Sequence, residues 1–336
     1  MLKFMAVVSG LCLLACWQVR PSLAQSVDVH LMPREVKLPH ADATSYGRGI
    51  ADPELRTHTK PLKKNVDLVL VPVMITDPMN RLVAGLEKDS FVLTEDGQPQ
   101  QIRSFSSEDA PISLGVIFDV SGSMADKIDK SRRAVLEFFR TANPDDDFFI
   151  VTFSDTPRVL VDFTSSVEDI QSQLAYAIPK GCTALLDAIY LGINRMREAR
   201  HERKALLIIS DGGDNHSRYT EGEIKAMVRE ADVQIYAMGL FNFRGNTPEE
   251  LHGPELLSEV TEATGGQTFF IQSPSDLADV AAKIGIELRN QYLLGYRPKN
   301  PTHDGKWRKI RVKVNPPKGL PPLHVYAKTG YYAAAE

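Results

Sequence analysis

Continuous apolar strands alternate with amphipathic helices through the middle of the chain, and this alternation limits the fold more than any other feature of the sequence. The apolar run Ile112–Val120 is followed by helical spacing of apolar residues over Asp126–Thr141, and the same order recurs until about Asn290. Strands that are apolar on both faces are typical of parallel sheets covered by helices on both sides. The sequence therefore predicts an α/β fold with a doubly wound, mostly parallel, Rossmann-like sheet.

One pair of strands inside this region breaks the alternation. Phe148–Phe153 and Val159–Phe163 are separated only by a short Ser-Asp-Thr-Pro segment, which is typical of a hairpin. A hairpin here predicts one antiparallel strand at the edge of the sheet. Ser166 and Thr220 each precede an acid by three residues, which predicts that each caps the start of a helix.

The segments on either side of the alternating region have the pattern of β structure. Val66–Ile75 is a strand candidate near the start of residues 63–108, and Tyr292–Tyr296 opens the strand-rich, proline-rich residues 291–336. We expect an α/β domain at residues 110–290 between an N-terminal and a C-terminal β unit. We also expect the two β units to pair into one small sheet domain, into which the α/β domain is inserted.

The first residues have the pattern of an export signal. Lys3 precedes the apolar run Phe4–Trp17, and Ser-Leu-Ala ending at Ala24 is a small-x-small cleavage site. The run is shorter than the roughly 20 residues that a membrane-spanning helix needs. Residues 1–24 are therefore expected to be a signal peptide, followed by a linker or extended arm at 25–62.

A second interpretation of this segment concerns Cys16. Leu-Leu-Ala-Cys, ending at Cys16, resembles a lipoprotein cleavage box, in which the cysteine would carry a lipid. The expected location is therefore exported, either periplasmic or secreted, with a lipoprotein anchored at Cys16 as the alternative. A membrane contact is expected only if Cys16 is lipidated or the signal stays uncleaved.

The charge and the cysteine content limit the class of partner and the means of stabilisation. The 336 residues carry a net charge of −4 and no long basic run, which argues against nucleic acid as a partner. Of the three cysteines, two lie in the signal segment and only Cys182 lies beyond it. A chain of this size can bury enough apolar surface to fold without disulfides.

Oxygen-bearing side chains lie on three predicted loops, at the edge of the sheet where the ends of parallel strands should meet. Asp119, Ser121 and Ser123 follow the first apolar strand, Thr183 precedes a helix, and Asp211 follows the strand that ends at Ser210. In a doubly wound sheet, ligands bind at the carboxyl ends of strands where the strand order reverses. Carboxylate and hydroxyl oxygens suit Mg²⁺, Mn²⁺ or Ca²⁺ rather than zinc or copper. The sequence predicts a divalent-cation site formed by these five residues.

The same five positions carry a resemblance to a known family. The Asp-x-Ser-x-Ser motif at Asp119, with Thr183 and Asp211 at suitable places, resembles the metal-ion-dependent adhesion site of von Willebrand factor type A domains. The resemblance covers residues 110–290, and the flanks resemble those of exported bacterial proteins with a type A-related domain. It implies that Ser121, Ser123 and Thr183 contact the metal directly and that the two acids support them. It also implies a binding module whose metal contacts an acidic residue of a protein partner.

Two other classes of function stay open beside this one. An assembly scaffold with a purely structural metal would use the same residues. A metal-dependent hydrolase is the less favoured alternative, because the sequence contains no His-Glu-x-x-His, no phosphate-binding Gly-x-x-x-x-Gly-Lys and no Gly-x-Ser-x-Gly motif. We therefore expect no catalytic residues.

Four further places in the sequence have simpler interpretations than a functional role. Cys182 stands where many type A domains have glycine before the threonine, and we expect a partly buried small residue there. Asp214 is expected to be a solvated loop acid and His216 a surface residue. The acidic run 145–147 is expected to form a turn before a strand rather than a second cation site.

Overall fold

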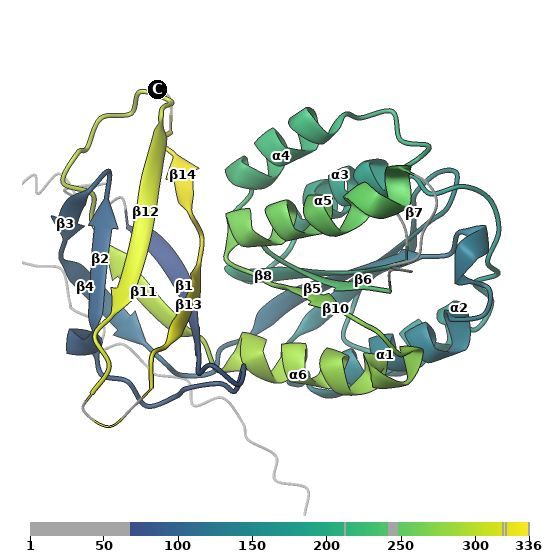
Figure 1. Cartoon of the computed structure of the whole chain (residues 1–336), viewed down its shortest axis with the longest axis horizontal. Coiled ribbons are helices and arrows are strands. Elements are labelled where there is room, and N and C mark those ends of the chain that lie inside the picture. Colours follow the sequence, from purple (N-terminus) through teal and green to yellow (C-terminus); the bar gives the residue numbers. More distant parts are fainter. Residues whose placement is uncertain (1–67, 212, 241–247, 318, 320, 335–336) are drawn as a thin grey trace, which may run out of the picture. The chain divides into compact units, whose positions relative to one another are not determined.

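Buried strands flanked by helices form the middle of the chain between the two flanking β segments, as Figure 1 shows for the computed structural model. The structure describes residues 68–334 apart from 212, 241–247, 318 and 320. The expected signal peptide at 1–24, including Cys16, and the expected arm at 25–62 lie outside the described residues. Residues 63–336 form one unit. Among the described residues, no helix is long and apolar enough to cross a membrane.

A six-stranded sheet organises the α/β region. The strand order is β10-β9-β8-β5-β6-β7, and only β6 and β7 pair antiparallel among the neighbouring strands. The α/β prediction is confirmed, and so is the antiparallel edge hairpin. The strands are β5 (Ile112–Asp119), β6 (Asp147–Phe153), β7 (Arg158–Thr164), β8 (Arg203–Ser210), β9 (Gln234–Gly239) and β10 (Thr268–Phe270).

Helices cover both faces of this sheet (Figure 1). One apolar core joins the sheet to α1, α2 and α6, and the other joins it to α3, α4 and α5. Every residue of β5 and of β6 is buried, as expected for strands between two helical layers. The helices are α1 (Ile128–Arg140), α2 (Val167–Leu174), α3 (Leu185–Met196), α4 (Glu221–Glu230), α5 (Pro248–Thr264) and α6 (Leu277–Arg289).

The predicted caps form at the starts of two helices. The Ser166 side chain accepts a hydrogen bond from the backbone N–H of Asp169 at the start of α2. At α4, Thr220 and Glu223 form a complete capping box, in which each side chain bonds the backbone N–H of the other residue. Such caps satisfy backbone donors that have no partner within the helix.

The flanking segments form two four-stranded sheets that share one core. The sheets have the orders β13-β1-β11-β4 and β14-β12-β2-β3, so strands from before and after the α/β region pair within each sheet. Buried residues of both sheets, such as Val73 and Leu93, belong to the same apolar cluster. The strands are β1 (Val69–Thr76), β2 (Phe91–Glu95), β3 (Gln98–Gln100), β4 (Ile102–Ser106), β11 (Tyr292–Tyr296), β12 (Trp307–Val314), β13 (His324–Ala327) and β14 (Gly330–Tyr332).

Candidate metal centre

Three loops meet at the carboxyl edge of the six-stranded sheet. The chain leaves β5 for β6 on one side and later returns to β8 on the other side, so the strand order reverses between β5 and β8. Asp119 ends β5 and Asp211 directly follows β8. The loop before α3 joins them, because the backbone N–H of Gly122 donates to the carbonyl of Gly181 at 3.0 Å. The predicted residues therefore lie where doubly wound sheets bind ligands.

Asp119 is the most deeply buried acid of this centre. Its side chain accepts from the backbone N–H of Ser121 at 2.8 Å and from the hydroxyl of Ser210 at 2.6 Å. Burial disfavours the charged form and raises the pKa of Asp119 to about 6, although these hydrogen bonds act in the opposite direction. A cation beside Asp119 would favour its charged form.

Two serines and the second acid form a continuous chain of oxygens. The hydroxyls of Ser121 and Ser123 lie 3.1 Å apart, and Ser123 donates to Asp211 Oδ1 at 2.8 Å. Neighbouring ligands in an octahedral Mg²⁺ shell, with bonds near 2.1 Å, lie about 3.0 Å apart. The oxygen spacing in this chain therefore fits that shell without a large rearrangement.

Thr183 is held to the loop that follows β8 by its backbone. Its N–H donates to the side-chain carbonyl of Asn215 at 2.9 Å, and its own carbonyl accepts from the N–H of Asn215 at 3.0 Å. The side chain of Thr183 is buried. The structure thus places Thr183 between the loop that follows β5 and the loop that follows β8.

Gly181 has the left-handed backbone conformation in the loop before α3. The expectation that Cys182 is partly buried is wrong, because its side chain is exposed. Gly181 has φ +82°, and a Cβ there would lie 2.6 Å from the carboxylate of Asp155. Cys182 donates its N–H to the same carboxylate at 2.7 Å, and its side chain is exposed rather than partly buried. Because the left-handed conformation falls on residue 181, the following cysteine is not strained.

The expectation for Asp214 is also wrong, whereas His216 is exposed as predicted. Asp214 is half-buried and accepts hydrogen bonds from the N–H of Leu186 at 3.2 Å and from the hydroxyl of Ser217. Its carboxylate therefore fixes the start of α3 against the loop after β8. An acid a few residues after a strand can anchor the next loop, and composition alone does not distinguish that role from solvation.

Sequence reasoning missed Lys127. Its ammonium lies 2.5 Å from Asp211 Oδ2 and 3.2 Å from the carbonyl oxygen of Ser123. The available signal was its spacing, because a residue four positions after Ser123 at a helix start can reach back to that carbonyl. Lys127 supplies the cationic partner of Asp211 in this structure.

The donor set fits a hard divalent cation. It contains two carboxylates and three hydroxyls, all of them oxygen ligands. In the described part of the chain, no group of three or more His, Cys, Asp or Glu side chains could hold a metal ion. This centre has only two acids, so a cation bound here would rely on the hydroxyls as well.

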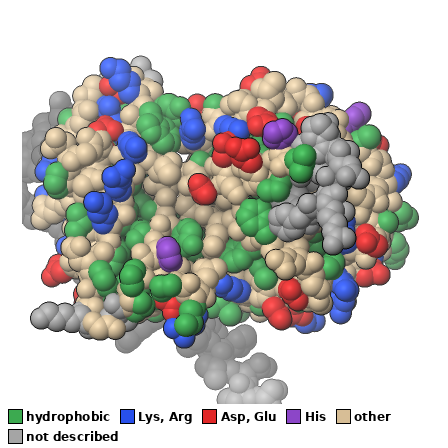
Figure 2. All heavy atoms as spheres, in the orientation of Figure 1, with side chains coloured by type: hydrophobic (Ala, Val, Ile, Leu, Met, Phe, Trp, Pro, Cys, Tyr) green, Lys and Arg blue, Asp and Glu red, His purple; other side chains and the backbone are tan. Residues whose placement is uncertain are grey.

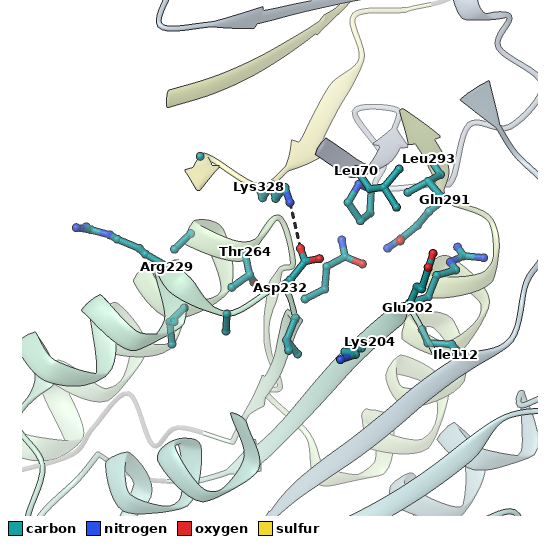
Figure 3. A pocket seen from close by; sticks show the side chains of 18 residues that line it. Leu70, Ile112, Glu202, Lys204, Arg229, Asp232, Thr264, Gln291, Leu293 and Lys328 are labelled. Carbon is teal, nitrogen blue, oxygen red and sulfur yellow. Dashed lines mark hydrogen bonds and ion pairs between the residues drawn. The ribbon is translucent and has the colours of Figure 1, made fainter. Parts of the chain in front are cut away.

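A hollow at the opposite edge of the sheet is the rival site (Figure 3). Residues at the starts of β8 and β9, among them Lys204 and Gln234, line it together with residues of the flanking strands. Figure 3 shows the ion pair across it, in which Lys328 Nζ lies 3.1 Å from Asp232 Oδ1. Gln291 donates to the hydroxyl of Tyr236 at 3.1 Å. Lys328, Asp232 and Gln291 thus already have partners within the chain, which favours a structural role for these side chains over a ligand-binding one.

Comparisons with known proteins give one family match and a set of similar structures. Residues 114–213 match the model of the von Willebrand factor type A domain family. A search of curated proteins gives no match. A von Willebrand factor type A structure from Catenulispora acidiphila is 13% identical, with 80% of this chain and 75% of that chain covered and a TM-score of 0.47.

Two further solved structures are similar at the same level. The conserved hypothetical protein BatB from Bacteroides thetaiotaomicron is 17% identical, with 52% of this chain and 98% of that chain covered and a TM-score of 0.42. The PilB minor pilin from Streptococcus sanguinis is 14% identical, with 57% of this chain and 64% of that chain covered and a TM-score of 0.44. Residues 114–213 thus match the von Willebrand factor type A domain family, and the sheet with its two helical layers has the Rossmann-like architecture of a type A domain.

Proposed function

We propose that this protein is an exported, non-catalytic binding module that holds a divalent cation at Asp119, Ser121, Ser123, Thr183 and Asp211. Type A domains are in general protein-interaction modules, which supports binding rather than catalysis. The observation that carries the proposal is the chain of oxygens from Ser121 through Ser123 to Asp211 at the switch point of the sheet. Mg²⁺ fits this spacing, and Mn²⁺ or Ca²⁺ would use the same oxygens.

The partner of the cation is proposed to be an acidic side chain of a protein. The two carboxylates of the centre supply only two negative charges, so a bound divalent ion still attracts an anionic oxygen at an open position. When bound, the ion supplies a positive point charge that can hold such an oxygen. Asp119 and Asp211 would balance that charge, while the hydroxyls of the centre orient the ion.

Exposed apolar side chains beside the centre support a protein partner. Tyr176 is 81% exposed and Ile178 is 72% exposed, on the segment that leads to Gly181. The residue between them is fixed, because Ala177 is buried and its carbonyl accepts a hydrogen bond from Arg132. Large apolar side chains on a fixed backbone lose little entropy when a partner covers them, and tyrosine is enriched among residues that dominate binding energy.

Selection of peptides would test the acidic partner. A displayed random peptide library would be selected on the immobilised protein with Mg²⁺ present, beside the variants Ser123→Ala and Ser107→Ala. Ser107 is an exposed serine away from the centre and serves as the control. We expect peptides with an obligatory Asp or Glu that bind wild type and Ser107→Ala but not Ser123→Ala. Binding that persists in EDTA, or after the acid is changed to its amide, would contradict the proposal.

The scaffold alternative makes a different prediction in the same experiment. A purely structural metal would stabilise the fold without contacting a partner. Mg²⁺ would then raise the unfolding temperature, while peptide binding would not depend on the metal or on an acid.

A further inference from the structure

We propose that Lys127 is an internal cation that competes with a divalent ion for Asp211, so that loading the centre exchanges an ammonium group for a metal. The inference rests on the cation site of the proposed function and adds a residue that sets its affinity. It concerns the state of the centre before the ion arrives, in which the buried acid already has a positive partner.

The contacts of Lys127 are those of a counter-ion. Its Nζ is 2.5 Å from Asp211 Oδ2, and Asp211 Oδ1 accepts from Ser123, so both carboxylate oxygens are engaged. The Asp211 side chain is 1% exposed and that of Lys127 is 22% exposed. A buried carboxylate without a partner costs several kcal/mol in general. Lys127 therefore stabilises the centre when no metal is bound.

The position of Lys127 in the helix indicates that its role is at the centre. Lys127 is the N-cap residue of α1 and makes no side-chain capping hydrogen bond there. A cation at a helix N-terminus is disfavoured, because the helix dipole places partial positive charge at that end. The contact with Asp211, rather than the stability of α1, is the favourable interaction that this lysine gains.

Lys127 can also leave. Its stem has four carbons, its ammonium is strongly hydrated in water, and part of the side chain already reaches solvent. An ammonium group a few ångströms from a divalent ion would be repelled by it. Metal binding therefore requires that the ammonium release Asp211, and that release lowers the apparent affinity for the ion.

Calorimetric titration of Mg²⁺ into Lys127→Met and into Lys130→Met tests the exchange. Lys130 lies in the first turn of α1, three residues after Lys127. Both variants remove one lysine, so they have the same net charge. We expect Lys127→Met to bind Mg²⁺ about ten-fold more tightly than wild type. Lys130→Met should differ from wild type by less than about two-fold, because a more distant surface charge is screened. Lys127→Arg keeps the charge and should show no such gain.

Thermal unfolding in EDTA gives a second readout that does not require metal binding. Lys127→Met should unfold at a lower temperature than Lys130→Met, because its buried Asp211 has lost its partner. Added Mg²⁺ should then raise the unfolding temperature more in Lys127→Met than in wild type. If Lys127→Met does not fold, Lys127→Gln replaces it in both measurements.

The outcomes separate this inference from the proposed function. Equal Mg²⁺ affinity in wild type, Lys127→Met and Lys130→Met would overturn the exchange and leave the cation site in place. An absence of Mg²⁺ binding in all of them would overturn both. Binding by Lys127→Met alone would support the competition by the lysine and would contradict the proposed function, because the wild-type protein would then hold no cation.

Discussion

The two edges of the six-stranded sheet both carry buried acids, but they surround those acids differently. At the amino edge, Asp146 accepts from the backbone N–H groups of Ile112 and Asn143 and pairs with Arg289. At the carboxyl edge, Asp211 accepts from a serine hydroxyl and from one lysine. Backbone amides and arginine can only donate, whereas hydroxyls can also offer lone pairs to a cation. For Asp146 and Asp211, which are both buried, the partners therefore distinguish a structural anchor from a candidate ligand better than burial does.

This comparison also explains the acidic run 145–147. As expected, it forms a turn before a strand, because Asp147 begins β6. Its acids connect the strand starts, since Asp147 accepts from the hydroxyl of Ser113 at 2.5 Å and lies 3.3 Å from the guanidinium of Arg200. Such fixed partners leave little room for a cation. Figure 2 shows that the face in view carries both acidic and basic side chains.

The largest expected effect is the loss of the anchor at the amino edge. Asp146→Ala leaves the backbone N–H groups of Ile112 and Asn143 without their acceptor. It also leaves the Arg289 side chain, which is 12% exposed, with Asp109 as its remaining carboxylate partner. We expect the free energy of unfolding to fall by about 3–5 kcal/mol. Asp145→Ala removes the exposed neighbouring acid and should change it by less than about 0.5 kcal/mol. Urea denaturation of the two variants measures both, and similar values would contradict the anchor role.

Glu287, a buried acid on α6, sharpens the comparison because no hydrogen bond satisfies its carboxylate. Both carboxylate oxygens of Glu287 lack a hydrogen bond, and Lys283 Nζ is 3.7 Å away. Burial raises the pKa of Glu287 to about 7, so the folded state holds its proton more tightly than the unfolded state does. The contribution of Glu287 to the free energy of unfolding is then fully present below the unfolded-state pKa of about 4.3, and it is lost as pH rises toward 7.

Glu287→Gln should remove that pH dependence. At pH 8 the variant should be more stable than wild type by about 2–3 kcal/mol, and near pH 4 the two should be similar. Urea denaturation across this pH range measures the difference, with the exposed Glu230→Gln as the control. A constant difference between Glu287→Gln and wild type at all pH values would rule out titration of this group as the cause.

At the carboxyl edge, the acid should matter more for binding than for folding. Asp211→Asn keeps the side-chain shape but removes the charge, so Mg²⁺ affinity should fall by at least about ten-fold. In EDTA the free energy of unfolding should fall by about 1 kcal/mol or less, because Lys127 is partly exposed and can turn to water. Calorimetry and urea denaturation measure the two effects. A loss of stability as large as that of Asp146→Ala would show that the two edges are equivalent.

The smallest effect is expected on the exposed apolar segment beside the centre. Tyr176→Ser should change the free energy of unfolding by less than about 0.5 kcal/mol, since its side chain is 81% exposed. Leu174→Ala, two residues earlier at a buried position, should cost about 2–5 kcal/mol. Urea denaturation distinguishes them. A large cost at Tyr176 would mean that its ring contributes to folding and is not free for a partner.

The sequence predicts the layers of this fold well and its shortest elements poorly. Long apolar runs such as Ile112–Val120 and the hairpin turn determine the sheet, because burial on both faces leaves few alternatives. The three-residue strands β3 and β14 are too short to show a periodicity of their own. β3 follows a turn in which Asp96 and Gly97 both have positive φ, a signal that closes β2 and implies a returning strand.

The candidate site also has a part that the sequence predicts and a part that only the structure shows. Spacing along the chain places Asp119, Ser121 and Ser123 on one loop, and the end of an apolar strand places Asp211 near them. The pairing of Lys127 with Asp211 joins residues 84 positions apart, and it depends on where α1 begins relative to β8. The role of Asp155 likewise depends on the backbone of Gly181, which sequence spacing does not show.

The most direct test of the central claim is a calorimetric titration of Mg²⁺ into the protein, beside Asp119→Ala and the exposed-acid control Asp126→Ala. Mn²⁺ and Ca²⁺ would be titrated in parallel, and circular dichroism would show that each variant is folded. The account predicts saturable binding at one site in the wild type and in Asp126→Ala, and its loss in folded Asp119→Ala. Folded wild-type protein that binds none of the three ions, or binding unchanged in Asp119→Ala, would contradict it.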